Sequence, residues 1–347
     1  MRRAAWRFRA TMVVLAVLLV VAVVLGVGLG AVGIAPGTVL SLFAWKLHLI
    51  ARPDVPKSVE IIVFQLRLPR VLLAGVVGMG LAVAGLLFQG LFRNPMADPA
   101  VIGVSSGAAL GAIVVILAGG AAILGGLGVA GAAFAGALVV AFVVYRLARI
   151  GPAVHVVTLL LAGIAVAAVM SGVMSVVMSF SGEQIRNIYF WILGGLSSRG
   201  WAALQVVTPI VFVGTAAAGF LVNDLNLLAL GEERAAQLGV EVERTKRRTL
   251  ALGSLLAAAA VSVSGVIGFV GLMTPHLLRL VIGADHRRLL PACVLAGPTI
   301  LILADLASRT LIAPEELPLG AVTAVLGGPF FLYLLRRQRG ARGGVLV

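Results

Sequence analysis

The sequence predicts an all-α, polytopic membrane protein with about ten transmembrane helices. Hydrophobic residues make up 61% of the 347-residue chain, charged residues only 12%, and the mean hydropathy is +1.13. A soluble domain carries about 25% charged residues. The apolar runs reach the roughly 20 residues that a helix needs to cross a bilayer, and they do not alternate as the strands of an outer-membrane barrel do. We therefore expect a single transmembrane domain over residues 1–347.

An apolar run over residues 11–34 opens the chain and follows four arginines. It is too long for a cleaved signal peptide and lacks a clear small-x-small cleavage site, so we expect a retained first helix. Nine more spans are predicted, and the eighth in the chain is short enough to be a partly broken helix. They lie at about 61–92, 100–118, 121–145, 155–180, 201–222, 249–270, 271–284, 289–308 and 317–335.

The charge pattern gives the expected orientation. The formal net charge is +14, and the basic residues flank apolar helices, so anionic lipid is the expected partner rather than nucleic acid. With the amino terminus in the cytoplasm, 19 of the 27 Lys and Arg residues fall on the cytoplasmic side and 8 outside. This distribution follows the positive-inside rule. We expect a multi-pass protein of the cytoplasmic (inner) membrane with both termini in the cytoplasm.

A polar stretch at residues 230–248 interrupts the apolar pattern on the predicted cytoplasmic side. It is long enough for two short helices, and Gly231 and Gly239 can begin and end one of them, because glycine adopts the backbone angles of helix caps. Acids in the first turn and a small apolar side suit entry into a groove on another protein, although a solvated loop is the simpler alternative. The residues of this coupling helix are Gly231, Glu232, Glu233, Ala235, Ala236, Leu238 and Gly239.

A weak internal repeat has an offset of 180 residues. Five predicted helices separate its two copies, so the copies would cross the membrane in opposite senses, as the inverted repeats of transporters do. The identical pairs are Val83 and Val263, Gly85 and Gly265, Pro95 and Pro275, Val101 and Val281, Ile102 and Ile282, and Gly103 and Gly283.

Few side chains inside the predicted spans could carry chemistry. Asp305 is an acid in an apolar helix, but Arg309 lies one turn away, so a structural ion pair explains it as well as a functional role does. His276 has no second ligand nearby, and Cys293 is the only cysteine, so we expect neither a metal site nor an internal disulfide.

Two side-chain stripes mark the predicted span at 155–180, because residues four apart lie on one helix face. Flexible methionine and small serine could line a passage that must not bind its cargo tightly. Ordinary helix packing explains the same residues equally well. The stripes are Met170, Met174 and Met178, and Ser171, Ser175 and Ser179.

Three of the arginines on the predicted outer side, which the positive-inside rule depletes, lie at the ends of predicted spans. Arg67 and Arg70 open the second predicted span and share a helix face, and Arg309 closes the ninth. The simplest interpretation is that their guanidinium groups reach lipid headgroups. Glu315 and Glu316, on the same side, are expected to be solvated.

Motifs along the chain from about residue 61 to 337 resemble those of the FecCD-type permeases. These are the membrane subunits of ATP-binding-cassette (ABC) importers for iron chelates, haem and cobalamin. The matching motifs are 67–70 (RLPR), 84–85 (AG), 89–99 (QGLFRNPMADP), 103–107 (GVSSG), 230–239, 268–279 (GFVGLMTPHLLR), 285–287 (DHR), 303–305 (LAD), 316–320 (ELPLG) and 328–331 (GPFF).

The resemblance implies a homodimer of ten-helix subunits, two cytoplasmic ATPase subunits docked on the coupling helices, and an external binding protein. It also implies that Arg67, Arg70 and Arg309 pair with acidic residues of that binding protein. A cytoplasmic gate would lie at His155, Val156 and Val157, where two valines replace the polar gate residues of the cobalamin member. The chain has no Gly-x4-Gly-Lys-Ser/Thr loop, so it is not expected to be an enzyme or to bind a cofactor, and ATP belongs to the partner.

The favoured function is therefore the permease subunit of an importer for a ferric siderophore or haem. A cobalamin importer of the same family is the alternative. An ion-coupled secondary transporter would need titratable groups across the midplane, and the spans offer few beyond Asp305. An intramembrane enzyme would need a nucleophile with a base, or metal ligands, and no convincing set is present.

Overall fold

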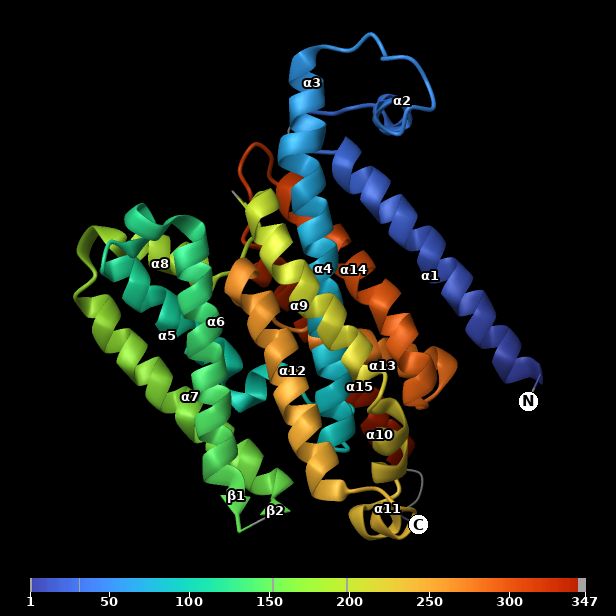
Figure 1. Ribbon diagram of the computed structural model, residues 1–347, viewed down its shortest axis with the longest axis vertical. Coiled ribbons are helices and arrows are strands. Elements are labelled where there is room, and N and C mark those ends of the chain that lie inside the picture. Colours follow the sequence, from blue (N-terminus) through green and yellow to red (C-terminus); the bar gives the residue numbers. More distant parts are fainter. Residues whose placement is uncertain (1, 31, 152, 198, 343–347) are drawn as a thin grey trace.

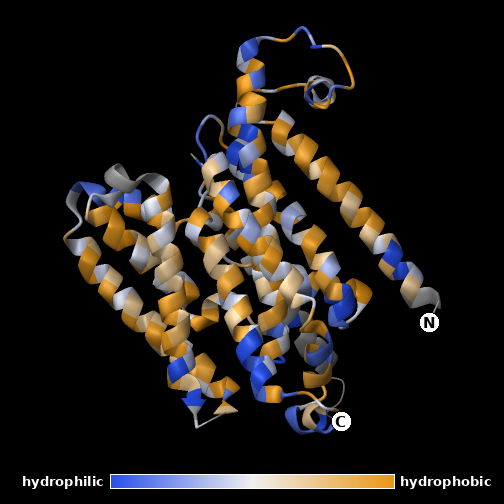
Figure 2. Ribbon diagram, viewed as in Figure 1, coloured by the Kyte–Doolittle hydropathy of each residue, from blue (hydrophilic) through white to orange (hydrophobic). Residues whose placement is uncertain are grey.

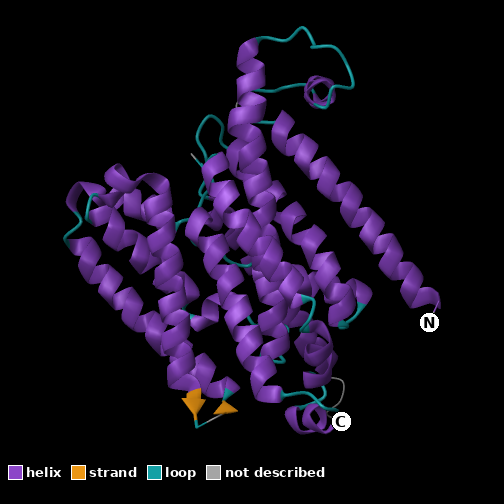
Figure 3. Ribbon diagram, viewed as in Figure 1, coloured by secondary structure: helices purple, strands orange, loops and turns teal. Residues whose placement is uncertain are grey.

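The chain folds into a bundle of helices with one pair of two-residue strands (Figures 1 and 3). The computed structural model describes residues 2–30, 32–151, 153–197 and 199–342. The helices are α1 (Arg2–Gly28), α2 (Pro36–Lys46), α3 (Lys57–Ile61), α4 (Leu68–Leu91), α5 (Val104–Leu117), α6 (Gly120–Ala148), α7 (Val156–Ser179), α8 (Ile185–Ile192), α9 (Trp201–Ala218), α10 (Val222–Leu228), α11 (Glu232–Gln237), α12 (Val242–Ser264), α13 (Val270–Ile282), α14 (His286–Thr310) and α15 (Leu319–Arg342). The shorter segments are the π-helix η1 (Ile62–Arg67), the 3-10 helices η2 (Pro99–Ile102) and η3 (Gly182–Gln184), and the antiparallel strands β1 (Arg149–Ile150) and β2 (Ala153–Val154).

Hydrophilic residues gather at the two ends of the bundle, and apolar residues cover its middle (Figure 2). One end, named the α8 end, holds α3, α8 and the loop at residues 311–318. The other, named the α11 end, holds α11 and the strand pair (Figure 1). The helix α1 begins and α15 finishes at the α11 end, so the chain crosses the bundle an even number of times, as the sequence predicts.

Each of the ten predicted spans contains one long helix, so the prediction of an all-α membrane protein is confirmed. Within the described residues, six helices are long and apolar enough to cross a bilayer. Three others are shorter apolar helices, and α12 opens with charged turns. The eighth span, α13, has only 13 residues, contains Pro275 and follows Phe269, whose φ is 66°.

Three predicted boundaries are wrong. The first helix ends at Gly28 rather than at 34, because glycines and a proline follow it. The second span begins at Lys57, since α3, η1 and α4 form one continuous helix. The helix α12 begins at Val242, so the basic residues at 244–248 belong to a long helix and not to a second short coupling helix.

The helix α4 is the centre of the bundle, with α9, α12, α13 and α14 packed around it. Every residue from Val76 to Leu91 is buried. An apolar helix buried on all sides is typical of the middle of a large bundle. Its position fixes the helices around it and, through them, the segments at both ends.

Glycines let the neighbouring helices approach α4 closely. A Cβ atom added to Gly78 would lie 2.4 Å from the carbonyl oxygen of Gly297 on α14, and one added to Gly297 would lie 2.4 Å from that of Gly78. Gly85 meets the backbone of Gly271 on α13 in the same way. In lipid, such small residues replace the hydrophobic effect as the basis of helix contact, because they allow backbone-to-backbone packing.

The two copies of the 180-residue repeat differ in local structure at some positions and agree at others. Gly85 lies inside α4, whereas its counterpart Gly265 follows the end of α12. Gly103 and Gly283 both adopt a positive φ, 79° and 89°, beside a helix end. The inverted relation between the copies stays a prediction.

Replacing Gly78 with valine should lower the free energy of unfolding by about 1–3 kcal/mol, because the added carbons overlap the backbone of α14. The matched control is Gly131→Val on α6, where an added Cβ meets no atom within 4 Å. Thermal unfolding in detergent compares the two. Equal unfolding midpoints would show that the α4–α14 crossing can separate without loss of stability.

Candidate functional site

An ion-pair cluster lies at the α8 end around one buried carboxylate, that of Asp305 on α14. The Asp305 side chain is 1% exposed. Arg70 of α4 approaches it with Nη2 at 2.9 Å, and Arg309, one turn along α14, approaches it with Nε at 3.0 Å. The predicted ion pair between Asp305 and Arg309 is therefore confirmed.

The same cluster reaches the loop before α15. Arg70 donates from Nη1 to Glu316 Oε1 at 2.8 Å, and Ser197 donates to Glu316 Oε2 at 2.6 Å. Burial alone would raise the pKa of Glu316, but the hydrogen bonds from Arg70 and Ser197, together with nearby positive charge, lower that pKa below its ordinary value. Glu315 and Glu316 are both exposed, as expected, and Glu316 is in addition bound by Arg70 and Ser197.

Two arginines fasten the end of α1. Arg67 donates from Nη1 to the carbonyl oxygens of Val27 at 3.0 Å and Gly28 at 2.8 Å. Arg309 donates to the carbonyl oxygens of Gly26 at 3.0 Å and Leu29 at 3.2 Å. The last carbonyl groups of a helix have no partners within it and attract positive charge, so both contacts are favourable.

The structure thus brings Arg67, Arg70 and Arg309 to the same end of the bundle, and each guanidinium group binds within the chain. Arg67 is 8% and Arg309 6% exposed. Neither guanidinium group therefore extends freely toward headgroups. The pairing of these arginines with a binding protein stays a prediction.

At the opposite, α11 end, the predicted coupling segment at 230–248 forms one short helix, α11, followed by the first turns of α12; the short helix α10 precedes it. Gly231 and Gly239 flank α11 with φ of 107° and 90°, which confirms their expected role as glycine caps. The side chains of Glu233, Ala236 and Leu238 are exposed, and Leu238 is 59% exposed.

One predicted contact residue of α11, Ala235, is turned toward its own chain rather than toward solvent. Ala235 is 0% exposed and belongs to the hydrophobic core, because α11 needs one apolar side to pack on its own chain. The surface that α11 offers to another protein therefore includes Ala236 and Leu238 but excludes Ala235.

Lys246 of α12 connects the coupling segment to the start of α7. Its side chain is 6% exposed, and its Nζ atom lies 2.5 Å from Glu232 Oε2 and 3.0 Å from Glu243 Oε1. Nζ also donates to the carbonyl oxygen of Val154 at 3.2 Å, and the Val154 N–H donates to Glu243 at 2.7 Å. The ammonium group of Lys246 therefore joins α11, α12 and β2. Val154 of β2 lies directly before the predicted gate residues.

Further hydrogen bonds tie α10 to the long helices. Thr245 of α12 donates to Asp224 at 2.9 Å. Asn226 donates to Asp285 at 2.7 Å and accepts from the backbone N–H of His286 at 2.9 Å. The segment from α10 to α11 is thus hydrogen-bonded to α12, to the start of α14 and, through Lys246, to β2.

The helix α7 carries the predicted gate and both stripes, and it is largely uncovered. Of its 24 residues, only Leu159 and Gly163 are buried. The gate residue His155 is the N-cap, Val156 is half-buried and Val157 is 69% exposed. These residues lie at the α11 end, beside β2 (Figure 1).

The structure separates the two stripes of α7. The serines are exposed, whereas the methionines are half-buried and pack against the core. The methionines therefore serve packing, and the serine face is the one available to a passage. The members are Ser171, Ser175 and Ser179, and Met170, Met174 and Met178.

Sequence reasoning missed Lys246 and the residues of a pocket at the α8 end. The ion pair of Lys246 could have been predicted from the spacing of Glu243 and Lys246, which are three residues apart in a helix. The pocket could have been suspected from Arg186 and Arg199, because arginine is depleted on the predicted outer side.

A bundle of long apolar helices, with a short exposed helix at one end, a charged cluster at the other and an uncovered helix between them, is typical of a transport permease. The chain belongs to the FecCD transport family, whose family model matches residues 18–337. It is accordingly an ABC importer permease, a transport subunit rather than an enzyme.

Individual relatives agree with this assignment. The chain is 46% identical to a cobalamin import system permease of Halobacterium salinarum over 81% of this chain and 75% of that one. It is also 46% identical to a hemin transport system permease of Yersinia pestis, over 81% and 84%. A solved structure described as an inward-facing conformation of a metal-chelate type ABC transporter superposes with a TM-score of 0.82 at 30% identity, over 94% of this chain and 98% of that one.

Replacing Asp305 with asparagine should lower the free energy of unfolding by about 3–5 kcal/mol, because Arg70 and Arg309 would lose their shared, buried counter-charge. The control is Glu241→Gln, whose partner Arg244 is 53% exposed and whose pair should contribute less than about 1 kcal/mol. Thermal unfolding of both variants in detergent is the measurement. If the Asp305→Asn protein were as stable as the control, the conclusion that this cluster stabilises the α8 end would be wrong.

Proposed function

We propose that this permease carries an iron chelate, a ferric siderophore or haem, across the cytoplasmic membrane by alternating access. The named relatives include a hemin permease and an Fe(3+)-citrate import permease of Bacillus subtilis, which is 37% identical over 93% of each chain. A cobalamin importer is the second candidate, because the relative from Halobacterium salinarum supports it equally.

The exposed coupling helix at the α11 end is the observation that carries the proposal of an ATPase partner. Two ATPase subunits would bind there, one on each α11, which puts this end and both termini in the cytoplasm. An external binding protein would then dock at the α8 end. The last expected partner is a second copy of the chain. It would cover α7, so that the passage would run between the two copies along the serine face of α7.

The contacts at the α11 end suggest how ATP-driven closure would reach the passage. A displacement of α11 acts on Glu232, and Lys246 transfers it to the carbonyl group of Val154 immediately before α7. At the same time Asn226 and Thr245 link α10 to α14 and α12. The gate residues His155, Val156 and Val157 would move with β2.

Uptake by the assembled transporter tests the proposal. The permease is reconstituted in liposomes with its ATPase subunits and binding protein, and ATP-dependent uptake is measured for haem, a ferric siderophore, ferric citrate and cobalamin. Uptake of an iron chelate but not of cobalamin is the expected result. Uptake of cobalamin alone would select the second candidate, and uptake of none would contradict the function.

Replacing Ala236 with tryptophan should abolish association with the ATPase subunits, because the bulky ring would occupy the surface that enters their groove. The fold should be intact, since Ala236 is exposed. The same change at exposed Ala202, at the start of α9, is the matched control, and Ala235→Trp should instead damage the fold. Copurification of the ATPase is measured. Normal copurification with Ala236→Trp would exclude α11 as the docking helix.

Cysteines on the two stripes of α7 should differ in reactivity toward a water-soluble thiol reagent. Ser171→Cys and Ser175→Cys should react in the assembled transporter, because their face would line the passage, whereas Met174→Cys should react more slowly. Background is low since Cys293 is 0% exposed. Val213→Cys, 69% exposed on α9, is the control for a lipid-facing position. Protection of both serine positions with and without nucleotide would mean that this face is packed rather than wet.

A further inference from the structure

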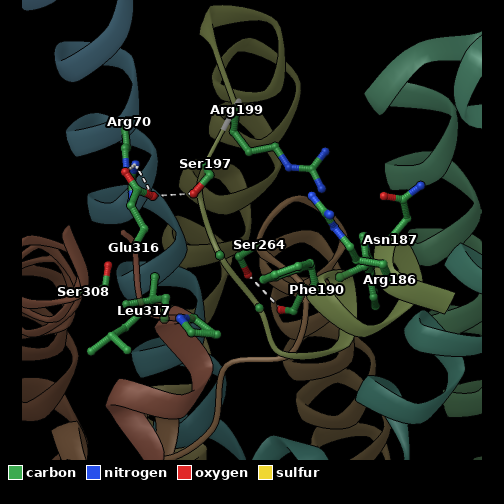
Figure 4. Close-up of a pocket in the computed structure, with 16 residues that line it drawn as sticks. Arg70, Arg186, Asn187, Phe190, Ser197, Arg199, Ser264, Ser308, Glu316 and Leu317 are labelled. Carbon is green, nitrogen blue, oxygen red and sulfur yellow. Dashed lines mark hydrogen bonds and ion pairs between the residues drawn. The ribbon is translucent and has the colours of Figure 1, made fainter. Parts of the chain in front are cut away.

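A pocket of about 560 Å³ opens at the α8 end (Figure 4). Its walls come from α8, from the loop that joins α8 to α9, from the end of α12 and from the loop before α15. The ion pair of Arg70 and Glu316 forms one side of the pocket. The opposite side holds Arg186 of α8 and Arg199 of the α8–α9 loop.

These two arginines differ from those of the Asp305 cluster. Their guanidinium groups are turned toward one another on the side of the pocket that faces Arg70 and Glu316 (Figure 4). Within the described parts of the chain, neither of them forms an ion pair, whereas Arg70 has two carboxylate partners. Burial lowers the pKa of Arg199, because no carboxylate offsets the loss of water around its charge. Two guanidinium groups that line one side of a pocket without a carboxylate partner attract an anion, and they match a carboxylate in shape.

Aromatic rings adjoin this pair of charges. Phe190 is 57% exposed and Trp191 lines the same wall, so the arginines lie beside apolar ring surface. The Nε1 atom of Trp191 is buried without a hydrogen-bond partner among the described residues. A ligand that combined a flat apolar body with a carboxylate would use both kinds of surface.

The base of the pocket is built from backbone and is therefore well defined. Gly195 donates its N–H to the carbonyl oxygen of Ser264 at 2.8 Å, and Leu319 donates to that of Gly194 at 3.0 Å. A Cβ added to Gly194 or Gly265 would lie 2.4 Å or 2.2 Å from a neighbouring carbonyl oxygen. The loop that joins α8 to α9 is thus hydrogen-bonded to the end of α12 and to the start of α15.

We propose that Arg186 and Arg199 form a subsite at the outer mouth that receives a carboxylate of a planar chelate as the binding protein releases it. The inference rests on the proposed function and narrows it, since a carboxylate-bearing planar chelate such as haem would use the subsite. A chelate with its carboxylates masked would bind only through the aromatic wall.

The experiment compares haem with haem dimethyl ester, which has the same ring and no free carboxylate. ATP-dependent uptake of each is measured in liposomes that contain the permease, its ATPase subunits and its binding protein. The double variant Arg186→Gln with Arg199→Gln should raise the KM for haem at least tenfold and leave the KM for the ester unchanged. The control is Lys57→Gln, which removes one positive charge from an exposed position at the same end.

Two additional measurements separate the alternatives. Thermal unfolding verifies that the double variant is folded, and Arg186→Lys, which keeps the charge, should recover part of the haem affinity. The association rate of the binding protein is measured separately, because acidic side chains on that protein are the other possible source of carboxylate. An unchanged association rate with a raised KM for haem supports the subsite.

Several results would overturn it. The subsite is excluded if the double variant takes up haem like the wild type, if it loses haem and ester equally, or if it slows only the binding protein. If the wild type took up cobalamin but not haem, the proposed subsite would be contradicted, whereas the importer function would not. Failure of the wild type to take up any chelate would instead contradict the proposed function itself.

Discussion

The carboxylate of Asp305 is the interaction on which the α8 end depends. It is the shared counter-charge of Arg70 and Arg309, and these two arginines in turn reach Glu316 and the end of α1. Charges buried in a low-dielectric bundle persist only when they are paired and hydrogen-bonded. One acid on α14 therefore positions α4, α1 and the loop before α15 relative to each other, and the wall of the pocket follows from that arrangement.

Lys246 plays the complementary role at the α11 end, with the signs reversed. There one buried ammonium group is shared by the carboxylates of Glu232 and Glu243 and by the carbonyl group of Val154. Between the two charged ends lies α4, which is apolar and closely packed by glycine contacts. The molecule thus has an apolar, closely packed middle and a polar junction at each end.

Much of this architecture could be predicted from the sequence, because span length and charge asymmetry are local properties that one chain displays directly. The ten helices, the glycine-flanked helix α11 and the pair of Asp305 and Arg309 were all predictable in that way. The direction in which Ala235 faces was not, since a six-residue helix with apolar residues on more than one side has no unique buried face. Contacts such as Arg70 with Glu316, which are 246 residues apart, depend on tertiary packing and leave no periodic signal.

The hydrogen bonds from Arg67 and Arg309 to the end of α1 have a consequence for biosynthesis. The carbonyl groups at the end of α1 are bound by Arg67, which is translated soon afterwards, and by Arg309, which emerges some 280 residues later. Much of α1 is exposed on one side, while the other side packs on the bundle, mainly on α14. The hydrogen bonds from Arg309 can form only after α14 has been made, so the first helix of the chain completes its contacts with one of the last.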